Sequence, residues 1–572
     1  MRKAAVGFAV PMLAVAVLAV ASIGPVRGAV GEPSATAREF LVLYEEGALP
    51  AEARAAIEAA GGSIVRENTA IGLATVRSRN QSFAEHAARR RAIAGTALNR
   101  SIGHSPPLLR PKIDELQRLN RQRRASRGRP AAITQRATSE AEPLESLQWG
   151  NEILGATAEG SYAVQTGRRE VLVGIIDTGI DARHPDLRGN FHKELSRNFT
   201  RDIPRVDGPC RKERDESCDD PPNVDENGHG SHVAGIVAAR LNDLGIGGIA
   251  PNVKLVNLRA GQDSGFFFLQ ETVGALTFAA DNGIDVVNMS FYIDPWLYNC
   301  PNNPADSPAS QEQQQVIIAA TQAAVDYALD RGVTLVGSLG NSHTDLGNPK
   351  FDDTSPDFPP GSEYERIVDN TCLDLPVEAE GVIGVSAVGP SLRKTYYSNY
   401  GIEQTDLAAP GGDFFDLFGT EGHRTTGNLI LSAYPLRIAK AAFEVRVDKR
   451  RNRIRSLSPY VVVDCKGPRA TRKCGAYQYL EGTSMASPHV TGVAALIISQ
   501  FGAENDDGLG MDPAEVFNRL KATASKQDCP DPSTFIYPGL PPEYDAVCET
   551  GPESNGGYGY GVVDALNAII AP

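Results

Sequence analysis

Three short segments of the chain carry the residue types that nucleophilic catalysis needs. Asp177 lies in Gly-Ile-Ile-Asp-Thr-Gly, His229 in Asn-Gly-His-Gly-Ser-His, and Ser484 in Gly-Thr-Ser-Met-Ala-Ser-Pro-His. A serine hydroxyl is a weak nucleophile at neutral pH, so it needs a base that takes its proton and an anion that orients the base. The small residues around each segment allow a close approach of backbones. We therefore predict a triad of Asp177, His229 and Ser484 for acyl transfer.

These segments and their order, Asp then His then Ser, resemble those of the subtilisin-like serine peptidases. The resemblance extends from Trp149 to a closing segment at residues 558–564. It implies a serine endopeptidase that cuts proteins or peptides through an acyl-enzyme, with no cofactor for the chemistry. It also implies that His229 carries the proton and that His232 is structural. The spacing of the two histidines also suits metal ligands, but the Glu of a zinc-peptidase motif is absent between them.

Two further segments are expected to bind the substrate. Gly340 and Asn341 follow an apolar run and resemble the family's oxyanion segment, in which the amide and the backbone N–H of the nucleophile stabilise the developing charge. Ser290-Phe291-Tyr292-Ile293 stands where the family usually has Ser-Leu-Gly-Gly, an edge that pairs with substrate. The resemblance implies that substrate contacts involve Ser290, Phe291, Tyr292 and Gly340, and that the bulk of Tyr292 and Ile293 narrows the pockets.

A calcium site is implied by the same resemblance. Asp186 follows Asp177 at the family's spacing, and the loop 240–246 is similar in length to a calcium loop of the family. Carboxylate, amide and carbonyl oxygens are suitable ligands for calcium. The alternative is an ordinary loop with no ion. The implied ligands are Asp186, Asn242 and the carbonyls of Arg240, Leu244 and Ile246.

The elements that position these residues are read from apolar runs that alternate with helix-like stretches. Near-continuous apolar strands separated by helices indicate a mostly parallel sheet covered on both faces, with functional groups at the carboxyl ends of strands. The predicted fold is therefore α/β, a subtilisin-like three-layer arrangement. The expected strands are 171–176, 253–258, 286–289, 333–337 and 382–385, and the expected helices are 233–240, 271–281, 316–331 and 486–500.

The N-terminal quarter divides into three parts before a catalytic domain at 146–572. Residues 1–21 have the basic start, apolar run and small-residue end of a signal peptide, so we expect secretion; a membrane anchor is the alternative. Residues 22–103 read as a small α+β domain that fits an inhibitory propeptide by its position, or else as an unrelated domain. The Pro- and Arg-rich stretch 104–145 is a linker that contains or adjoins the processing site.

The charge distribution and the cysteines limit which partners and which cellular compartment are expected. Up to Glu145 the chain holds 21 Lys and Arg against 13 Asp and Glu, and beyond it 35 against 57. Such an acidic body is poorly suited to nucleic acid or anionic membranes, whereas the basic leader suits it as an intramolecular inhibitor. We expect a monomer with no membrane contact after signal cleavage. Eight cysteines allow 105 pairings; proximity in sequence favours Cys210–Cys218, Cys465–Cys474 and Cys529–Cys548, and elimination leaves Cys300–Cys372.

Two insertions and two alternative functions stay open at this point. The Cys210–Asp225 stretch precedes His229, and Pro435–Cys474 reads as an extra hairpin before Ser484. Each is either a surface elaboration or a wall of the cleft. One alternative function is a processing peptidase of narrow specificity that matures a partner protein. The other is a silent binding scaffold, which is disfavoured because all three triad residues and Asn341 are present.

Overall fold

A computed structural model describes residues 37–99, 142–210, 217–448, 453–505 and 508–571. The predicted signal peptide at 1–21 and most of the predicted linker lie outside these residues. Among the described residues, none of the helices combines the length and apolar character needed to cross a membrane.

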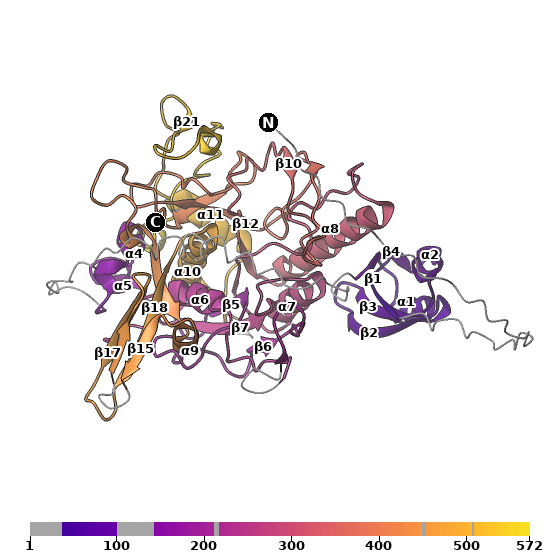
Figure 1. Cartoon of the computed structure of the whole chain (residues 1–572), viewed down its shortest axis with the longest axis horizontal. Helices are drawn as coiled ribbons and strands as arrows, with labels where there is room; N and C mark the ends of the chain where they lie inside the picture. The colour runs from indigo at the N-terminus through magenta and orange to yellow at the C-terminus, as the bar shows by residue number, and fades with distance from the viewer. Residues whose placement is uncertain (1–36, 100–141, 211–216, 449–452, 506–507, 572) are drawn as a thin grey trace, which may run out of the picture. The chain divides into compact units, whose positions relative to one another are not determined.

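A seven-stranded parallel sheet forms the centre of the structure (Figure 1), as the apolar runs predicted. Alternate residues of its strand β5 enter different apolar clusters: Val173 and Ile175 point to one face, and Ile176 to the other. Both faces of the sheet are therefore buried, which explains the continuous apolar runs. In spatial order the strands are β13 (Leu407–Pro410), β12 (Ile383–Val388), β9 (Thr334–Ser338), β8 (Val286–Met289), β5 (Leu172–Asp177), β7 (Lys254–Arg259) and β6 (Arg197–Asn198).

Helices cover the two faces and complete the three layers (Figure 1). One face carries α6 (His229–Ala238) and α10 (Thr483–Phe501), and the other α7 (Leu269–Asp281) and α8 (Pro308–Leu329). The predicted α/β three-layer fold is thus confirmed. All four predicted helices begin earlier than expected. The largest differences are in α6, which begins at His229 rather than Val233, and in α8, which begins at Pro308 rather than Val316, where the Ser307 side chain accepts the N–H of Ser310.

The insertion at 435–474 is larger than the single hairpin that the sequence suggested. It contains a short helix, α9 (Leu436–Ala441), and two hairpins. The first pairs β15 (Val445–Asp448) with β16 (Arg453–Ser456), and the second pairs β17 (Val461–Lys466) with β18 (Lys473–Leu480). Strand β18 also pairs with β14 (Ile430–Tyr434), so the second hairpin extends a three-stranded antiparallel sheet.

Residues 37–99 form a separate four-stranded antiparallel sheet with its own apolar cluster. Three of its apolar side chains, Leu41, Leu73 and Ala97, are buried instead in the cluster that contains α7 and α8. Polar contacts accompany them: Arg66 pairs with Glu271 at 2.7 Å. In spatial order the strands are β2 (Gly62–Asn68), β3 (Leu73–Ser78), β1 (Arg38–Tyr44) and β4 (Ile93–Leu98), with helices α1 (Pro50–Ala59) and α2 (Phe83–Ala88).

Four disulfides close the loops of the body, in the pairing that proximity and elimination favoured. They are Cys210–Cys218, Cys300–Cys372, Cys465–Cys474 and Cys529–Cys548. The remaining elements are short or peripheral: α4 (Trp149–Ile153), α5 (Ser161–Val164), α11 (Pro513–Thr523), α12 (Asn567–Ile570), β10 (Phe351–Asp352), β11 (Arg366–Ile367), β19 (Ala503–Asn505), β20 (Gly508–Gly510), β21 (Thr534–Phe535) and β22 (Ala546–Val547).

Candidate active site

Asp177 and His229 are paired at the carboxyl end of β5. The Asp177 carboxylate is fully buried, and its Oδ1 and Oδ2 lie 2.8 and 3.0 Å from Nδ1 of His229. This contact fixes the ring and leaves Nε2 facing away from the carboxylate. Burial lowers the pKa of His229, but the negative charge of Asp177 and the hydrogen bond to it, helped by Asp225, outweigh burial, so the pKa is raised above its usual value.

A second buried carboxylate, Asp225, holds the start of α6. Its oxygens accept the N–H groups of Gly228 at 2.7 Å and Ser231 at 2.9 Å and the hydroxyl of Thr178 at 3.2 Å. Helix N-termini leave N–H groups without intrahelical partners, and an anion there is stabilised. Gly228, with φ of 103°, offers no side-chain cap, so Asp225 supplies it from three residues upstream. The sequence analysis missed this role.

Ser484 lies in the first turn of α10, which packs against α6. Its hydroxyl donates to the carbonyl of Ser290 at 3.3 Å, and no hydrogen bond to the His229 ring is formed within the described residues. Hydrogen bonds between catalytic residues often have long donor–acceptor distances until the substrate binds. The Ser290 hydroxyl in turn contacts Ser487 at 2.8 Å and accepts from Asn288 at 2.8 Å, which fastens the end of β8 to α10.

Asn341 is anchored to the turn that precedes Ser484. Its Oδ1 accepts the N–H of Thr483 at 2.9 Å and the hydroxyl of Thr483 at 3.0 Å. The neighbouring Gly340 donates its N–H to the same hydroxyl at 3.1 Å. Because the oxygen of the amide is used in this way, its nitrogen is left to donate to another group. This is the arrangement that stabilisation of an oxyanion requires.

The predicted substrate edge at residues 290–293 is rigidly packed. Phe291 stacks on Phe267 with ring centroids 4.1 Å apart. The hydroxyl of Tyr292 donates to Asp357 at 2.5 Å, and the N–H of Ile293 donates to the carbonyl of Leu375 at 2.7 Å. Side chains that fill this edge are therefore held by partners outside it.

His232 is buried in α6 and contacts the protein interior. Its Nε2 lies 2.9 Å from the carbonyl of Gln478. Burial lowers the pKa of His232 to about 3, so the ring is neutral at physiological pH. The two histidines of the segment therefore have different surroundings, and His229 is the one that faces a carboxylate.

The proposed calcium ligands Asp186 and Asn242 are adjacent, but protein donors surround the carboxylate. Asp186 accepts the Tyr477 hydroxyl at 2.7 Å, the side-chain nitrogen of Asn242 at 3.0 Å and the N–H of Ile246 at 3.4 Å. Tyr477 reaches it from the inserted strand β18. Burial raises the pKa of Asp186 to about 7.

The loop 240–246 also binds two charged groups of the protein, of which the ammonium would repel a cation. Its N–H groups at Asp243 and Leu244 donate to Glu142 at 3.0 and 2.8 Å, and the Lys466 ammonium donates to the carbonyl of Asn242 at 3.0 Å. As arranged, Asn242 presents its nitrogen to Asp186 where calcium requires oxygen. The residues therefore do not fit a calcium ion unless they rearrange.

One insertion contacts the segment before the catalytic histidine. Arg437 of α9 forms an ion pair with Glu226. The ring of Tyr434, at the end of β14, packs against Gly228, where an added Cβ would lie 2.9 Å from it. Arg437 of the 435–474 insertion and the adjoining Tyr434 thus brace the start of α6.

The comparisons with known proteins give the family of the chain. The sequence profile described as the subtilase family matches residues 168–561, which is more than half of the chain. The chain therefore belongs to the subtilase family, and as a member of it is a serine peptidase, a hydrolase that acts on proteins or peptides. Catalysis in this family needs no cofactor.

The relatives include a subtilisin and a leader peptide-processing protease. The chain is 29% identical over 355 residues to subtilisin DY of Bacillus licheniformis, covering 62% of this chain and 84% of that protein. It is 28% identical over 366 residues to the nisin leader peptide-processing serine protease of Lactococcus lactis subsp. lactis, covering 63% of this chain but only 45% of that protein.

Solved structures support the fold. The epidermin leader peptide processing serine protease of Staphylococcus aureus matches with a TM-score of 0.59 at 19% identity, covering 94% of this chain and 98% of that one. Fervidolysin of Fervidobacterium pennivorans matches with a TM-score of 0.53 at 21% identity, covering 95% of this chain and 62% of that one.

Proposed function

We propose that the chain is a secreted serine endopeptidase that uses Asp177, His229 and Ser484. His229 takes the proton of Ser484 as the hydroxyl attacks a peptide carbonyl and returns it to the leaving amine, and water then hydrolyses the acyl-enzyme. The Asn341 side chain and the Ser484 N–H donate to the oxyanion. The contact of both Asp177 oxygens with His229 Nδ1 is the observation that carries this proposal.

The 37–99 unit is proposed to be the inhibitory part of a self-processed precursor, followed by a linker that is cut. Its support is the burial of Leu41, Leu73 and Ala97 among the side chains of α7 and α8. The hydroxyl of Thr75 also contacts Gln270 at 3.1 Å, and the side chain of Gln313 donates to the carbonyl of Leu98 at 3.2 Å. A unit held in this way adds to the stability of the fold that it precedes.

The processing of one partner protein is the second candidate within the same chemistry. The packed edge at Tyr292 and Ile293 favours it, because a narrowed edge excludes many side chains. Dispersed cuts across a peptide library would count against it. The catalytic site does not depend on this choice.

The calcium site at Asp186 and the loop 240–246 stays a prediction. The donors around Asp186 and the ammonium of Lys466 argue for a loop held by protein groups. No step of the proposed reaction involves an ion there.

Reaction with a fluorophosphonate probe tests the proposed function. The wild-type protein should be labelled at Ser484 and should shorten its own N-terminus, whereas Ser484→Ala should stay full length and unlabelled. Mass spectrometry of the intact protein and of its N-terminus measures both. A Ser484→Ala protein that matures equally well when expressed alone would rule out self-processing, and an unlabelled wild type would rule out the catalytic role.

A further inference from the structure

A buried carboxylate without a cation lies beside the oxyanion segment. Asp374 is 3% exposed, and none of the described residues forms a hydrogen bond or ion pair with its carboxylate. The N–H of Asp374 is used differently, since it donates to Glu378 at 2.7 Å. A buried anion without a partner is costly, and such a group in a native structure calls for an explanation.

Asp374 lies between the two segments that flank Ser484. On one side its neighbours Leu373 and Leu375 pair with the chain that continues from the substrate edge: Leu373 exchanges backbone hydrogen bonds with Asn299 at 2.8 and 2.9 Å, and Leu375 accepts from Ile293 at 2.7 Å. On the other side the carboxylate reaches Gly340, where an added Cβ would lie 3.3 Å from its Oδ2.

Gly340 keeps this space open. Its φ of 96° favours glycine, and an added Cβ would lie 2.6 Å from Nδ2 of Asn399 and 3.3 Å from Oδ2 of Asp374, so both side chains approach the backbone that leads to Asn341. The same residue donates to the hydroxyl of Thr483, next to the nucleophile. The carboxylate therefore lies close to the backbone of Gly340, next to the segment that is proposed to hold the carbonyl of the substrate.

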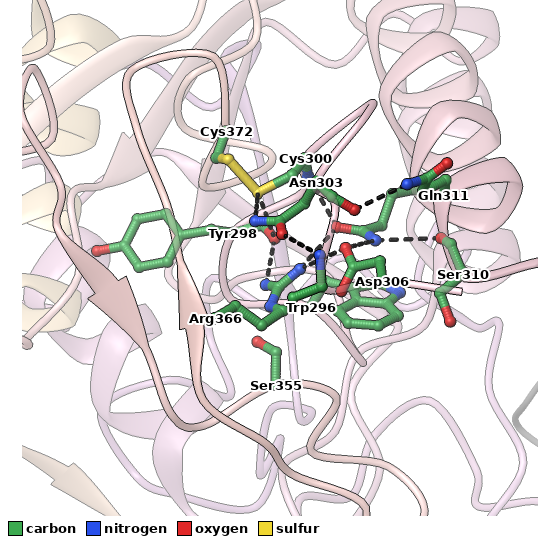
Figure 2. A network of polar contacts seen from close by, with 12 residues as sticks. Trp296, Tyr298, Cys300, Asn303, Asp306, Ser310, Gln311, Ser355, Arg366 and Cys372 are labelled. Carbon is green, nitrogen blue, oxygen red and sulfur yellow. Dashed lines mark hydrogen bonds and ion pairs between the residues drawn. A yellow bond between two sulfur atoms is a disulfide. The ribbon is translucent and has the colours of Figure 1, made fainter. Parts of the chain in front are cut away.

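Nearby buried carboxylates have a cation of their own, and Figure 2 shows this for Asp306. Arg366 donates to Asp306 at 3.0 Å and to Asp352 at 2.6 Å, and its guanidinium lies 4.7 Å from the Trp296 ring centroid. The Cys300–Cys372 disulfide closes the same region. Both terminal nitrogens of Arg366 are thus engaged by other groups, and Asp374 has no counterion among the described residues. Burial, together with the negative charges of Glu378 and Asp352, raises the pKa of Asp374 well above its usual value.

We propose that Asp374 binds the cationic side chain of a lysine or arginine that contributes the carbonyl of the cleaved bond, so that the enzyme cuts after basic residues. The inference rests on the proposed function, because it places that carbonyl between Ser484 and Asn341. The side chain of the same substrate residue then extends from the substrate backbone at a position beside Gly340. A long side chain with a terminal cation supplies the partner that Asp374 lacks within the protein.

Matched peptides that differ only in charge at this position test the proposal. Arginine and citrulline have nearly the same shape, but citrulline is neutral. For the mature enzyme we expect kcat/KM to favour arginine over citrulline by about 30-fold or more, the size of effect found for buried charge pairs. Asp374→Asn should reduce this preference to within a few-fold. Asp369→Asn is the matched control, because it removes the same charge from an exposed residue of the same segment and should keep the preference.

Two further measurements separate the possible failures. Fluorophosphonate labelling of Asp374→Asn shows whether the variant retains an active nucleophile. Benzamidine, an amidinium probe, should slow the labelling of Ser484 in the wild-type enzyme. This measurement needs no variant. The role of Asp374 alone is overturned if the enzyme is labelled and cuts peptides but has the same kcat/KM for the arginine and citrulline peptides. It is also overturned if benzamidine does not protect the enzyme from labelling. A wild type that is neither labelled nor active overturns the proposed function instead.

Discussion

The charge balance around His229 determines the pH at which the proposed triad works. Burial disfavours the charged ring, and the contact with Asp177 favours it more strongly, so the pKa of His229 is raised. The neutral ring is the form that accepts the Ser484 proton. Activity should therefore increase as the pH rises through this pKa, with a midpoint above the usual histidine value of about 6.5.

Asp177→Asn should reduce kcat by about four orders of magnitude, because the tautomer and the imidazolium lose their anion. It should also move the acid limb of kcat/KM to lower pH, since burial would remain and the largest favourable charge would be gone. Steady-state rates between pH 4 and 9 on one peptide measure both effects. An unchanged acid limb would show that a group other than His229 controls it.

Residues with local signals were predictable, and residues brought together by topology were not. Asp177, His229 and Ser484 each lie in a distinctive segment of small residues. Asp374 lies among ordinary residues, and only the pairing of Leu373 and Leu375 with the chain after β8 brings it to Gly340. Tyr477 was missed for the same reason, because its partner Asp186 is far away in sequence.

At the scale of elements, α6 depends on a cap from outside the helix. Asp225→Asn should lower stability by about 1–3 kcal/mol, because a buried charge-assisted network loses its anion. It should also lower the pKa of His229, to which Asp225 contributes. Urea unfolding and the pH profile of kcat/KM measure the two effects.

The exposed Asp219 of the same segment provides the control for Asp225. Asp219→Asn removes the same charge and should change neither stability nor the pH profile appreciably. Equal effects of the two substitutions would contradict the capping role.

The loop 240–246 gives a second prediction at this scale. Tyr477→Phe should destabilise the protein by about 1–3 kcal/mol, because Asp186 stays buried and loses a donor. In the wild type, EDTA should leave the melting temperature unchanged. Differential scanning calorimetry measures both, with Tyr479→Phe as a control on the same strand. A melting temperature that falls with EDTA would show that calcium binds after the donors around Asp186 rearrange.

The predicted elements were mostly correct in type, and their ends were less so. Strands of the central sheet were readable because both faces are buried and the runs are continuously apolar. The start of α6 was not readable from the sequence, because its first residues have poor helix propensity and the residue that caps it is remote. The 435–474 insertion was read as one hairpin, since nothing local distinguishes one pair of short strands from two.

At the scale of the whole chain, apolar packing should hold the 37–99 unit more than charge does. Leu73 is fully buried against the body, whereas Arg66 and Glu271 form a partly exposed pair, which typically contributes about 0–1 kcal/mol. In the Ser484→Ala precursor, Leu73→Asp should therefore make the 37–99 unit far more susceptible to added trypsin than Arg66→Gln does. Time courses of limited proteolysis at low and high salt measure this. A larger effect of Arg66→Gln, abolished by salt, would favour docking by charge.

The Cys300–Cys372 disulfide joins the segment after β8 to the segment that carries Asp374. Disulfides of this kind form in oxidising compartments. The residues of the proposed triad lie on β5, α6 and α10, which this disulfide does not join, whereas it does join the segments in which Leu373 and Leu375 pair with their partners. If Asp374 selects the substrate, catalytic activity and substrate selectivity are completed at different times. A reduced precursor would then be able to cleave peptide bonds before it is selective for its substrate. Keeping the N-terminal unit in place until oxidation is complete would then protect the cell that makes the enzyme.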